Sequence, residues 1–410
     1  MTKPGLLNRQ LALLRAKGLS WAIRNTLPKL IFQVIALPVA LVARLFGIRF
    51  LPVATQRIGH LALELDCYCK EQALGLHPRY LAFVCAPRDL VANQHLLEYW
   101  RPFVSLVQSR VLVWLLKPFS NHLILRFDVH GYTMALDQAA KYPALQRKWD
   151  GRPPLLKLSK EDKERGRRVL TELGVPQDAW FVCVHNREMG YSPTDEHWHS
   201  YRNSDIDSYA LAMKAIVQTG GWCIRVGDPT MKKMTPLKNV IDYAHHERRC
   251  DWMDVFLFAS CRFFLGNTSG PFLVASIFGV PVAVANIIPL GVSLPFGRND
   301  IGIPKLLRSK SENRLLTFKE IFSSELSTAR FSSQYSSLGI EIIDNSPEEI
   351  AALVTEQLER TSGNAIYTET DEELQRRFKS LMDARHYTFG SESRVGREFL
   401  RRYAYLLPPA

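Results

Sequence analysis

Apolar residues in the second half of the chain fall into short, nearly continuous runs that are separated by amphipathic stretches. Runs of this kind are typical of parallel strands that are buried on both faces. The pattern predicts a strand at 180–185, a helix at 206–218, strands at 222–226 and 240–243, a helix at 252–260, a strand at 263–266, a helix at 271–279 and a strand at 280–286. This alternation predicts a doubly wound α/β domain.

The first half of the chain alternates in a similar way. It predicts a strand at 50–54, a helix at 61–73, a strand at 80–86, a helix near 94–100 and a strand-like run at 111–116. The turn-rich segment 151–154 then interrupts regular structure, and a charged helix is predicted at 160–173. The expected fold class is therefore α/β, with two Rossmann-like doubly wound domains facing each other across a cleft, at 49–152 and 153–360.

Three more helices are predicted toward the C-terminus, at 346–360, 371–385 and 394–405. Ser346 and Glu349 have the spacing of a capping box at the start of the first one. We expect the last segment, 361–410, to pack back on the N-terminal domain.

Residues 1–48 combine basic and apolar positions. Lys and Arg alternate with Leu and Trp up to Lys29, and an apolar run follows at 30–43. That run is shorter than the roughly 20 residues that a spanning helix needs, and no small-residue cleavage site follows it. Two interpretations stay open, an anchor that lies on a membrane surface and a core helix of a soluble domain.

The composition is that of a globular protein with a positive net charge of +12, from 52 Lys and Arg against 40 Asp and Glu. This charge favours anionic partners, either phosphorylated small molecules or the head groups of an inner-membrane surface. The sequence contains no nucleic-acid-binding motif and its basic residues are scattered, so we expect no nucleic-acid partner. Seven cysteines, an odd number without a CxxC pair, indicate a reduced, cytoplasmic protein.

The most informative segment follows the predicted strand at 263–266. It contains Asn267, Thr268, Ser269 and Gly270, and Pro271 opens the next helix. Free backbone N–H groups, two hydroxyls and the positive end of a helix dipole suit a diphosphate. The alternative is an ordinary helix cap in which Ser269 satisfies its own backbone.

A second polar segment ends the strand at 180–185. Here Arg187 could clamp a phosphate, Asn186 lies beside it, and Glu188 or His185 could orient the phosphate or handle a proton. Ligands bind at this edge of open α/β sheets. The alternative is an internal Arg187–Glu188 salt bridge with a satisfied histidine.

The strand at 222–226 brings further candidates to the same edge. Arg225 lies within the strand, Gly227 permits a tight turn, and Asp228 follows it. Arg225 could instead be a flanking charge of the sheet and Asp228 the cap of a turn, so both rank below Ser269.

In the N-terminal domain, Arg57 and His60 lie in the connection from the first strand to the first helix. His60 suits a general base that removes a proton from an acceptor hydroxyl. It could alternatively bind an acceptor phosphate together with Arg57, or only cap the helix. Glu64, one turn along, is the alternative base.

Several of these segments together resemble the bacterial GT-B-type glycosyltransferases of surface-polysaccharide loci, and more distantly heptosyl- and fucosyl-transferases. The segments that carry the resemblance are RIGHLALE at 57–64, WFVCVHNRE at 180–188, YRNSDIDSY at 201–209, GGWCIRVGDP at 220–229, VIDYA at 240–244, FFLGNTSGP at 263–271 and SRVGREFLRRY at 393–403. The resemblance implies a nucleotide-diphospho-sugar donor held chiefly by the C-terminal domain and an acceptor approached from the N-terminal domain. It also implies that no metal and no further cofactor is bound.

The function expected from this resemblance is transfer of a sugar to a lipid-linked or polysaccharide acceptor in cell-surface glycan biosynthesis. Such an enzyme would be cytoplasmic and peripherally associated with the inner membrane. Two other functions stay open: a nucleotide-sugar epimerase of the same fold, and a non-catalytic scaffold that binds a sugar nucleotide.

Overall fold

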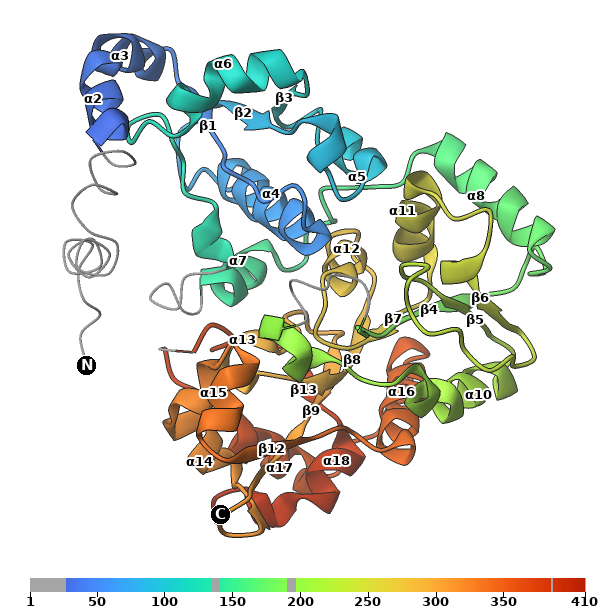
Figure 1. The fold of residues 1–410 in the computed structure, drawn as a ribbon. Coiled ribbons are helices and arrows are strands. Elements are labelled where there is room, and N and C mark those ends of the chain that lie inside the picture. Colours follow the sequence, from blue (N-terminus) through green and yellow to red (C-terminus); the bar gives the residue numbers. More distant parts are fainter. Residues whose placement is uncertain (1–26, 134–140, 190–196, 385, 410) are drawn as a thin grey trace.

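The computed structural model describes residues 27–133, 141–189, 197–384 and 386–409. The N-terminal part contains α2 (Leu27–Ile35), α3 (Leu37–Leu45), β1 (Ile48–Phe50), α4 (Ile58–Ala73), β2 (Leu81–Cys85), η1 (Arg88–Leu90), α5 (Gln94–Tyr99), β3 (Ser105–Val107), α6 (Arg110–Ser120), η2 (His130–Tyr132) and α7 (Lys141–Trp149). Strands β1, β2 and β3 form a three-stranded sheet in that order, and both pairs are parallel. This sheet and its helices lie above the C-terminal domain in Figure 1.

The rest of the chain forms a larger sheet with helices on both faces. Its elements are α8 (Lys160–Glu172), β4 (Phe181–His185), η4 (Ser200–Arg202), η5 (Ile206–Tyr209), α10 (Ala210–Gln218), β5 (Trp222–Arg225), β6 (Val240–Asp242), η6 (Tyr243–His245), α11 (Asp251–Ser260), β7 (Phe264–Gly266), α12 (Pro271–Ile277), β8 (Val282–Ile287), α13 (Leu290–Ser293), β9 (Ile301–Pro304), β10 (Leu306–Ser309), β11 (Arg314–Leu315), α14 (Phe318–Ser323), η7 (Glu325–Thr328), α15 (Ser332–Ser337), β12 (Ile340–Ile343), α16 (Pro347–Thr361), α17 (Glu369–Lys379), β13 (Arg394–Val395), α18 (Arg397–Arg402) and η8 (Ala404–Leu406). Seven strands are ordered β13-β9-β8-β7-β4-β5-β6, and every neighbouring pair is parallel.

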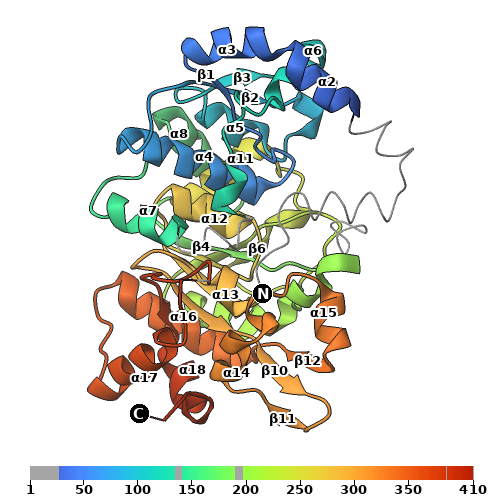
Figure 2. The same ribbon diagram turned by 90° about the vertical axis from the view of Figure 1, so that its left-hand side faces the viewer.

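Both main sheets are therefore parallel and lie between helices, which confirms the predicted α/β class with two Rossmann-like units. The two units meet where α4 packs against α12 (Figures 1 and 2). A third, small sheet of antiparallel strands, β11-β10-β12, was not predicted.

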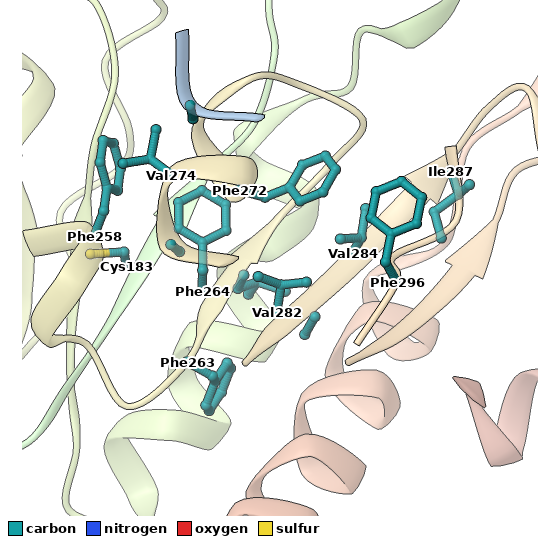
Figure 3. Close-up of a cluster of buried hydrophobic side chains, with 14 of the residues drawn as sticks. Cys183, Phe258, Phe263, Phe264, Phe272, Val274, Val282, Val284, Ile287 and Phe296 are labelled. Atoms are coloured by element: carbon teal, nitrogen blue, oxygen red, sulfur yellow. The ribbon is translucent and has the colours of Figure 1, made fainter. Parts of the chain in front are cut away.

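The core of the C-terminal domain forms because its strands carry apolar side chains on both faces. Figure 3 shows Phe263 and Phe264 pointing to opposite faces of the sheet, as successive strand residues do. The Phe264 ring points toward α12, the helix that carries Phe272, and it packs against Phe258 of α11 with ring centroids 5.8 Å apart. The side chains of Phe263, Phe264 and Val282 are fully buried. This packing fixes the end of β7, from which a predicted site segment leaves the sheet.

The strand predicted at 111–116 is wrong. These residues lie in α6, and the third strand is β3, which precedes it. Ser109 begins the helix, because its side chain accepts a hydrogen bond from the backbone N–H of Leu112. The β-branched Val111 and Val113 suggested a strand, but the helix start overrides that preference.

The apolar run at 30–43 is not a core helix. It is divided between α2 and α3, and most of its side chains are exposed. The described part of the predicted segment 1–48, residues 27–48, contacts the N-terminal domain, because Gln33 donates to the carbonyl of Asn121 and Arg44 to that of Ile124. No helix among the described residues is long and apolar enough to cross a membrane.

The expectation that 361–410 packs on the N-terminal domain also needs correction. Strand β13 joins the edge of the C-terminal sheet beside β9, and α18 packs on α16. Arg397 pairs with Glu359, and Gln375 donates to the carbonyl of Val395. A contact toward the N-terminal part is the hydrogen bond from Arg147 of α7 to the carbonyl of Gly390.

Candidate functional site

The order of the large sheet defines where a ligand is expected to bind. From β4 the chain winds outward through β5 and β6, and then returns to continue through β7 and β8 on the other side of β4. The winding direction therefore reverses between β4 and β7, and doubly wound sheets bind ligands at the carboxyl ends of the strands at such a switch point. Both leading candidate segments leave the sheet there, since His185 ends β4 and Gly266 ends β7.

Asn267 holds the two segments together. Its Oδ1 accepts a hydrogen bond of 2.9 Å from the backbone N–H of Arg187. Its Nδ2 donates to the carbonyl of Arg202 and the hydroxyl of Ser204, at 3.1 and 3.0 Å. Asn267 is completely buried, so it positions the edge of the site and does not meet a ligand itself.

The hydroxyls beyond Asn267 have different surroundings. Thr268 is nearly buried, and its Oγ1 accepts a hydrogen bond of 3.2 Å from the backbone N–H of Ile288. Ser269 is half-buried and its Oγ donates to the carbonyl of Asn267 at 3.2 Å. Helix α12 has Gly270 as its N-cap without a side-chain cap bond, so Ser269 is not the helix cap, although its hydroxyl does bond to the backbone of its own loop, as that alternative expected.

Arginines supply positive charge on the same side of the sheet. Arg187 is buried and its Nη1 donates to the carbonyl of His199 and to Asn203. Burial raises the pKa of Tyr201, whereas the charges of Arg202, Arg330 and Arg187 act to lower it, so three guanidinium groups act on one ring. The Nε of Arg202 is buried, and among the described residues it has no hydrogen-bond partner. An unpaired buried donor beside other cations suits an anionic ligand.

His185 is a neutral, buried histidine. Burial, reinforced by the charges of Arg225 and Arg187, lowers its pKa to about 4. Its Nδ1 forms a hydrogen bond of 3.0 Å with the carbonyl of Val226. A Cβ at Gly227 would lie 2.6 Å from Met231 Sδ, so a larger residue there would displace the methionine side chain. His185 therefore has a structural environment and is not suited to binding a phosphate by charge.

Glu188 and Arg225 belong to a buried charge network. Arg225 is fully buried and contacts Glu188 at 3.3 Å and Asp242 at 2.9 Å. Glu188 also accepts hydrogen bonds from the backbone N–H groups of Ile206 and Lys232, at 3.2 and 2.9 Å. The alternative Arg187–Glu188 salt bridge is thus replaced by an Arg225–Glu188 pair, and Glu188 is saturated by internal donors.

Two of the remaining predicted residues also have internal roles. Asn186 is fully buried and donates to Glu188 and to the carbonyl of Ser204. Asp228 accepts bonds from the backbone and the hydroxyl of Thr230, which is the turn-capping alternative.

In the N-terminal domain, His60 lies in the first turn of α4 and pairs with Glu64. The distance from His60 Nδ1 to Glu64 Oε1 is 2.8 Å, and the N-cap of α4 is Arg57, so His60 is not the capping residue. Glu64 is completely buried and also contacts His130 Nδ1 at 3.0 Å and Thr133 Oγ1 at 2.8 Å. Burial raises the pKa of Glu64, but the hydrogen bonds from His130 and His60 outweigh it, so the pKa lies below the usual value.

This geometry gives the two residues different roles. A carboxylate that accepts Nδ1–H fixes the imidazole tautomer that leaves Nε2 as the basic nitrogen. Among the described residues, no partner contacts Nε2 of His60. Glu64, in contrast, is saturated and buried, which suits an orienting carboxylate better than a base.

The two domains touch directly beside this pair. A Cβ on Gly59 would lie 2.9 Å from Gly270 Cα, and one on Gly270 would lie 2.9 Å from the backbone nitrogen of Gly59. Only two glycines allow so close an approach. The residue before His60 and the residue after Ser269 are therefore in contact, and the structure brings the two predicted half-sites together.

The cluster of His60, Glu64 and His130 also meets the geometric requirement of a metal site. One ligand atom from each residue lies within 4.8 Å of the others. Two histidines and a glutamate are a common ligand set for catalytic zinc. The short His–Glu hydrogen bonds account for the same arrangement without an ion, so a chelation experiment must distinguish the two.

A separate pocket of about 700 Å³ lies where α5 and η1 meet α11. Its lining consists of Arg88, Gln94, His95, Glu98, Arg249, Cys250, Asp251 and Trp252. None of the residues predicted from the sequence lines it. We therefore place the candidate site by the strand topology and the Gly59–Gly270 contact.

His130 and Thr133 were not predicted as site residues from the sequence. They lie 66 and 69 residues after Glu64 and reach it from η2 and the residue that follows. No local motif marks them. A polar cluster around a predicted catalytic pair becomes visible only when the fold is known.

Comparison with known proteins adds a distant likeness. No protein-family model and no curated protein matches the sequence. Similar solved structures include a glycosyl transferase family 9 protein from Veillonella parvula DSM 2008, with 9% identity, a TM-score of 0.36 and coverage of 58% of this chain and 80% of that one. The E. coli ADP-heptose lps heptosyltransferase II has 13% identity, a TM-score of 0.37 and coverage of 58% and 84%. E. coli heptosyltransferase WaaC with ADP has 10% identity, a TM-score of 0.33 and coverage of 63% and 91%.

The chain thus resembles glycosyltransferases of the heptosyltransferase type at a distance. At this level of identity and superposition, the matches carry no argument about substrate or mechanism.

Proposed function

We propose that the protein is a glycosyltransferase that moves a sugar from a nucleotide-diphospho-sugar to a hydroxyl group of an acceptor. The observation that carries the proposal is the contact between Gly59 and Gly270. It sets the His60–Glu64 pair of one domain beside the switch-point loop of the other. A transferase needs such an arrangement, because the base and the donor must meet at one acceptor hydroxyl.

In this proposal the donor diphosphate binds at the switch point. Ser269 and the backbone around Gly270 face it, and Arg202 supplies positive charge with its unpaired Nε. Asn267 sets the shape of the edge by accepting a hydrogen bond from the backbone N–H of Arg187, and the guanidinium group of Arg187 supplies further positive charge to the diphosphate. Glu188 and Arg225 contribute only by keeping the ends of the strands in place.

The reaction is a displacement at the anomeric carbon of the sugar. The acceptor oxygen forms the new bond to that carbon, the bond from the carbon to the diphosphate oxygen breaks, and the nucleoside diphosphate leaves. The proton of the acceptor hydroxyl passes to Nε2 of His60, and the carboxylate of Glu64 stabilises the resulting imidazolium. The proposal requires neither a resident metal nor a further cofactor.

The setting we propose is the synthesis of cell-surface glycans at the cytoplasmic side of the inner membrane, with a lipid-linked or polysaccharide acceptor. The sequence resemblance and the basic N-terminal region support this setting.

Donor turnover with and without acceptor tests the activity. Purified protein is incubated with UDP-, GDP-, ADP- and CMP-linked sugars in turn, and release of the nucleotide is measured before and after lipid-linked acceptors are added. Acceptor-dependent release is the expected result. Conversion of the donor to a stereoisomer without acceptor would instead identify an epimerase, and binding without turnover in every combination would identify a scaffold.

The His60→Ala variant tests the role of the base. Turnover should fall by about 10²-fold or more, while calorimetry gives donor affinity close to that of the unchanged protein. A lower apparent affinity for the acceptor alone, with turnover unchanged, would mean that His60 binds the acceptor and does not deprotonate it.

A further inference from the structure

The outer side of the N-terminal domain carries an unusual concentration of exposed apolar side chains. Helices α2, α3 and α6 lie together there, on the side of the sheet β1-β2-β3 that faces away from the C-terminal domain (Figures 1 and 2). Six large apolar side chains on these helices and in the turns beside them are more than two-thirds exposed: Val34, Ile35, Leu45, Phe46, Trp114 and Leu123. We call this surface, formed by α2, α3, α6 and the turn at 121–124, the three-helix face. Apolar patches of this kind mark binding surfaces in soluble proteins.

Contacts between the elements make the face a single surface. Gln33 of α2 donates to the carbonyl of Asn121 at 3.2 Å and accepts from the backbone N–H of Leu123 at 3.0 Å. The rings of Phe32 and Phe119 pack edge to face, with centroids 5.6 Å apart. The three helices therefore belong to one part of the N-terminal domain and are not independent segments.

The two stretches of sequence that contain the three helices carry basic residues and no acidic ones. Residues 1–63 contain nine Lys and Arg and no Asp or Glu, and residues 99–127, which include α6, contain four and none. The rest of the chain then carries 39 basic against 40 acidic residues, so these two stretches account for the net charge of +12. The basic residues are thus less scattered along the chain than predicted above. Arg44 and Lys117 are exposed on the helices themselves.

We propose that the three-helix face docks onto the surface of a membrane that contains anionic lipids. Apolar side chains would enter the boundary between head groups and acyl chains, and the basic residues would face the lipid phosphates. The helices have nine, nine and eleven residues, which suits helices lying in the plane of the interface. Trp114, at 72% exposure, is of the residue type enriched at that depth.

Charge favours a membrane over a second copy of the chain as the occupant. A symmetric dimer places the same patch of both copies together, so the basic residues of one face would meet those of the other. Asp89, which pairs with Arg110 at 2.6 Å, lies in η1 and not on the three helices. An anionic lipid surface supplies the missing negative charge. The inference deepens the membrane setting of the proposed function, but flotation tests it separately from the transferase activity.

Flotation of the full chain with lipid vesicles tests the proposal. We compare vesicles of phosphatidylcholine alone with vesicles that contain about 30% phosphatidylglycerol, at low and high salt, because salt screens the attraction to charged lipid. The expected result is binding to the anionic vesicles that weakens with salt. The Trp114→Glu variant should reduce the bound fraction by about tenfold or more, because it removes a large apolar side chain that the membrane would bury.

The matched control is Ile366→Glu. Ile366 is 78% exposed in the C-terminal domain, so this variant makes the same change of charge at an apolar surface residue away from the face. It should float as the unchanged protein does, and thermal unfolding should show that both variants are folded. Equal flotation of Trp114→Glu and the unchanged protein would overturn the proposal, as would failure of the unchanged protein to float. A concentration-dependent dimer that only Trp114→Glu dissociates would assign the face to a second copy instead.

Discussion

Glu64→Gln tests whether the buried carboxylate controls the chemistry of His60. Glu64 is the common partner of His60, His130 and Thr133, at 2.8, 3.0 and 2.8 Å. The amide has nearly the same shape, and its oxygen can still accept from the histidines. What the substitution removes is the negative charge.

The magnitude follows from these contacts. A hydrogen bond to a charged group contributes about 1.5 to 3 kcal/mol. Because the amide oxygen keeps part of each bond, we expect the free energy of unfolding to fall by about 2 kcal/mol. Turnover should fall by about 10²- to 10³-fold, since the imidazolium that forms on His60 loses its counter-charge. Donor affinity should stay unchanged, because Glu64 lies behind His60 and away from the diphosphate site.

The matched control is Glu71→Gln. Glu71 also lies on α4, and its carboxylate accepts a hydrogen bond of 2.5 Å from Tyr132 of η2, the helix that carries His130. This variant makes the same change between the same two elements without touching His60. Steady-state rates, calorimetry and urea unfolding are measured for both variants. If the two lose equal amounts of stability and turnover is equally unaffected, Glu64 has only a structural role.

A titration of His130 gives an independent readout. The hydrogen bond to Glu64 raises the pKa of His130 above its ordinary value, and burial only partly opposes it. The stability that this pair provides is therefore present at pH below the ordinary histidine pKa and is lost as pH rises through the raised value. In the Glu64→Gln variant the pKa of His130 should fall, as followed by NMR. Dialysis of the unchanged protein against a chelator completes the test, because activity that is lost there and restored by a divalent ion would assign the cluster to a metal.

Three further predictions concern residues of the C-terminal domain. Gly270→Ala should lower turnover at least about tenfold and lower the free energy of unfolding by about 1 to 3 kcal/mol. The reason is that the new Cβ would lie 2.9 Å from the backbone nitrogen of Gly59 and force the domains apart. Unchanged rates would show that the contact is dispensable. Ser269→Ala and Arg187→Ala should each weaken nucleotide-diphosphate binding by about 1.5 to 3 kcal/mol in calorimetry, with Arg187→Ala also lowering stability, and equal affinities would remove the donor-site assignment. His185 has a pKa of about 4, below the ordinary 6.5, so its contribution to stability is present above pH 6.5 and is lost as pH falls through 4. His185→Asn should therefore remove about 3 kcal/mol of the pH dependence of the free energy of unfolding, measured with urea. A pH profile that does not change would contradict this assignment.

The strands of the C-terminal sheet could be predicted because burial on both faces leaves a clear trace in the sequence. Strands β4 to β8 all lie within the predicted runs or end within one residue of them. Strand β9 was missed because Gly302 and Pro304 interrupt its apolar run, and β13 has only two residues. In the N-terminal domain the exposed apolar residues of α6 imitated a strand. A helix that presents apolar residues to its surroundings departs from the usual amphipathic pattern, which is the property that the membrane proposal uses.

The site was predicted at the level of segments but not of individual side chains. The edge of a parallel sheet follows from the order of the strands, so the segments after β4 and β7 could be paired from the sequence alone. Which residues on that edge remain available to a ligand depends on partners that are far away in the chain. Arg225 meets Asp242 and Glu188, which are 17 and 37 residues away, and these pairings were invisible from the sequence.

The charge network also explains why so many polar residues gather where only a few face a ligand. Each strand end leaves backbone groups without a sheet partner, and buried groups of this kind need hydrogen bonds. Glu188 and Asn267 provide them, since each bridges two or more segments at the edge. A loop fixed in this way can hold Ser269 and Gly270 against the neighbouring domain without rearrangement when a donor binds. The residues that hold the edge and those that meet the donor are therefore different sets, and mutations in the two sets should separate stability from affinity.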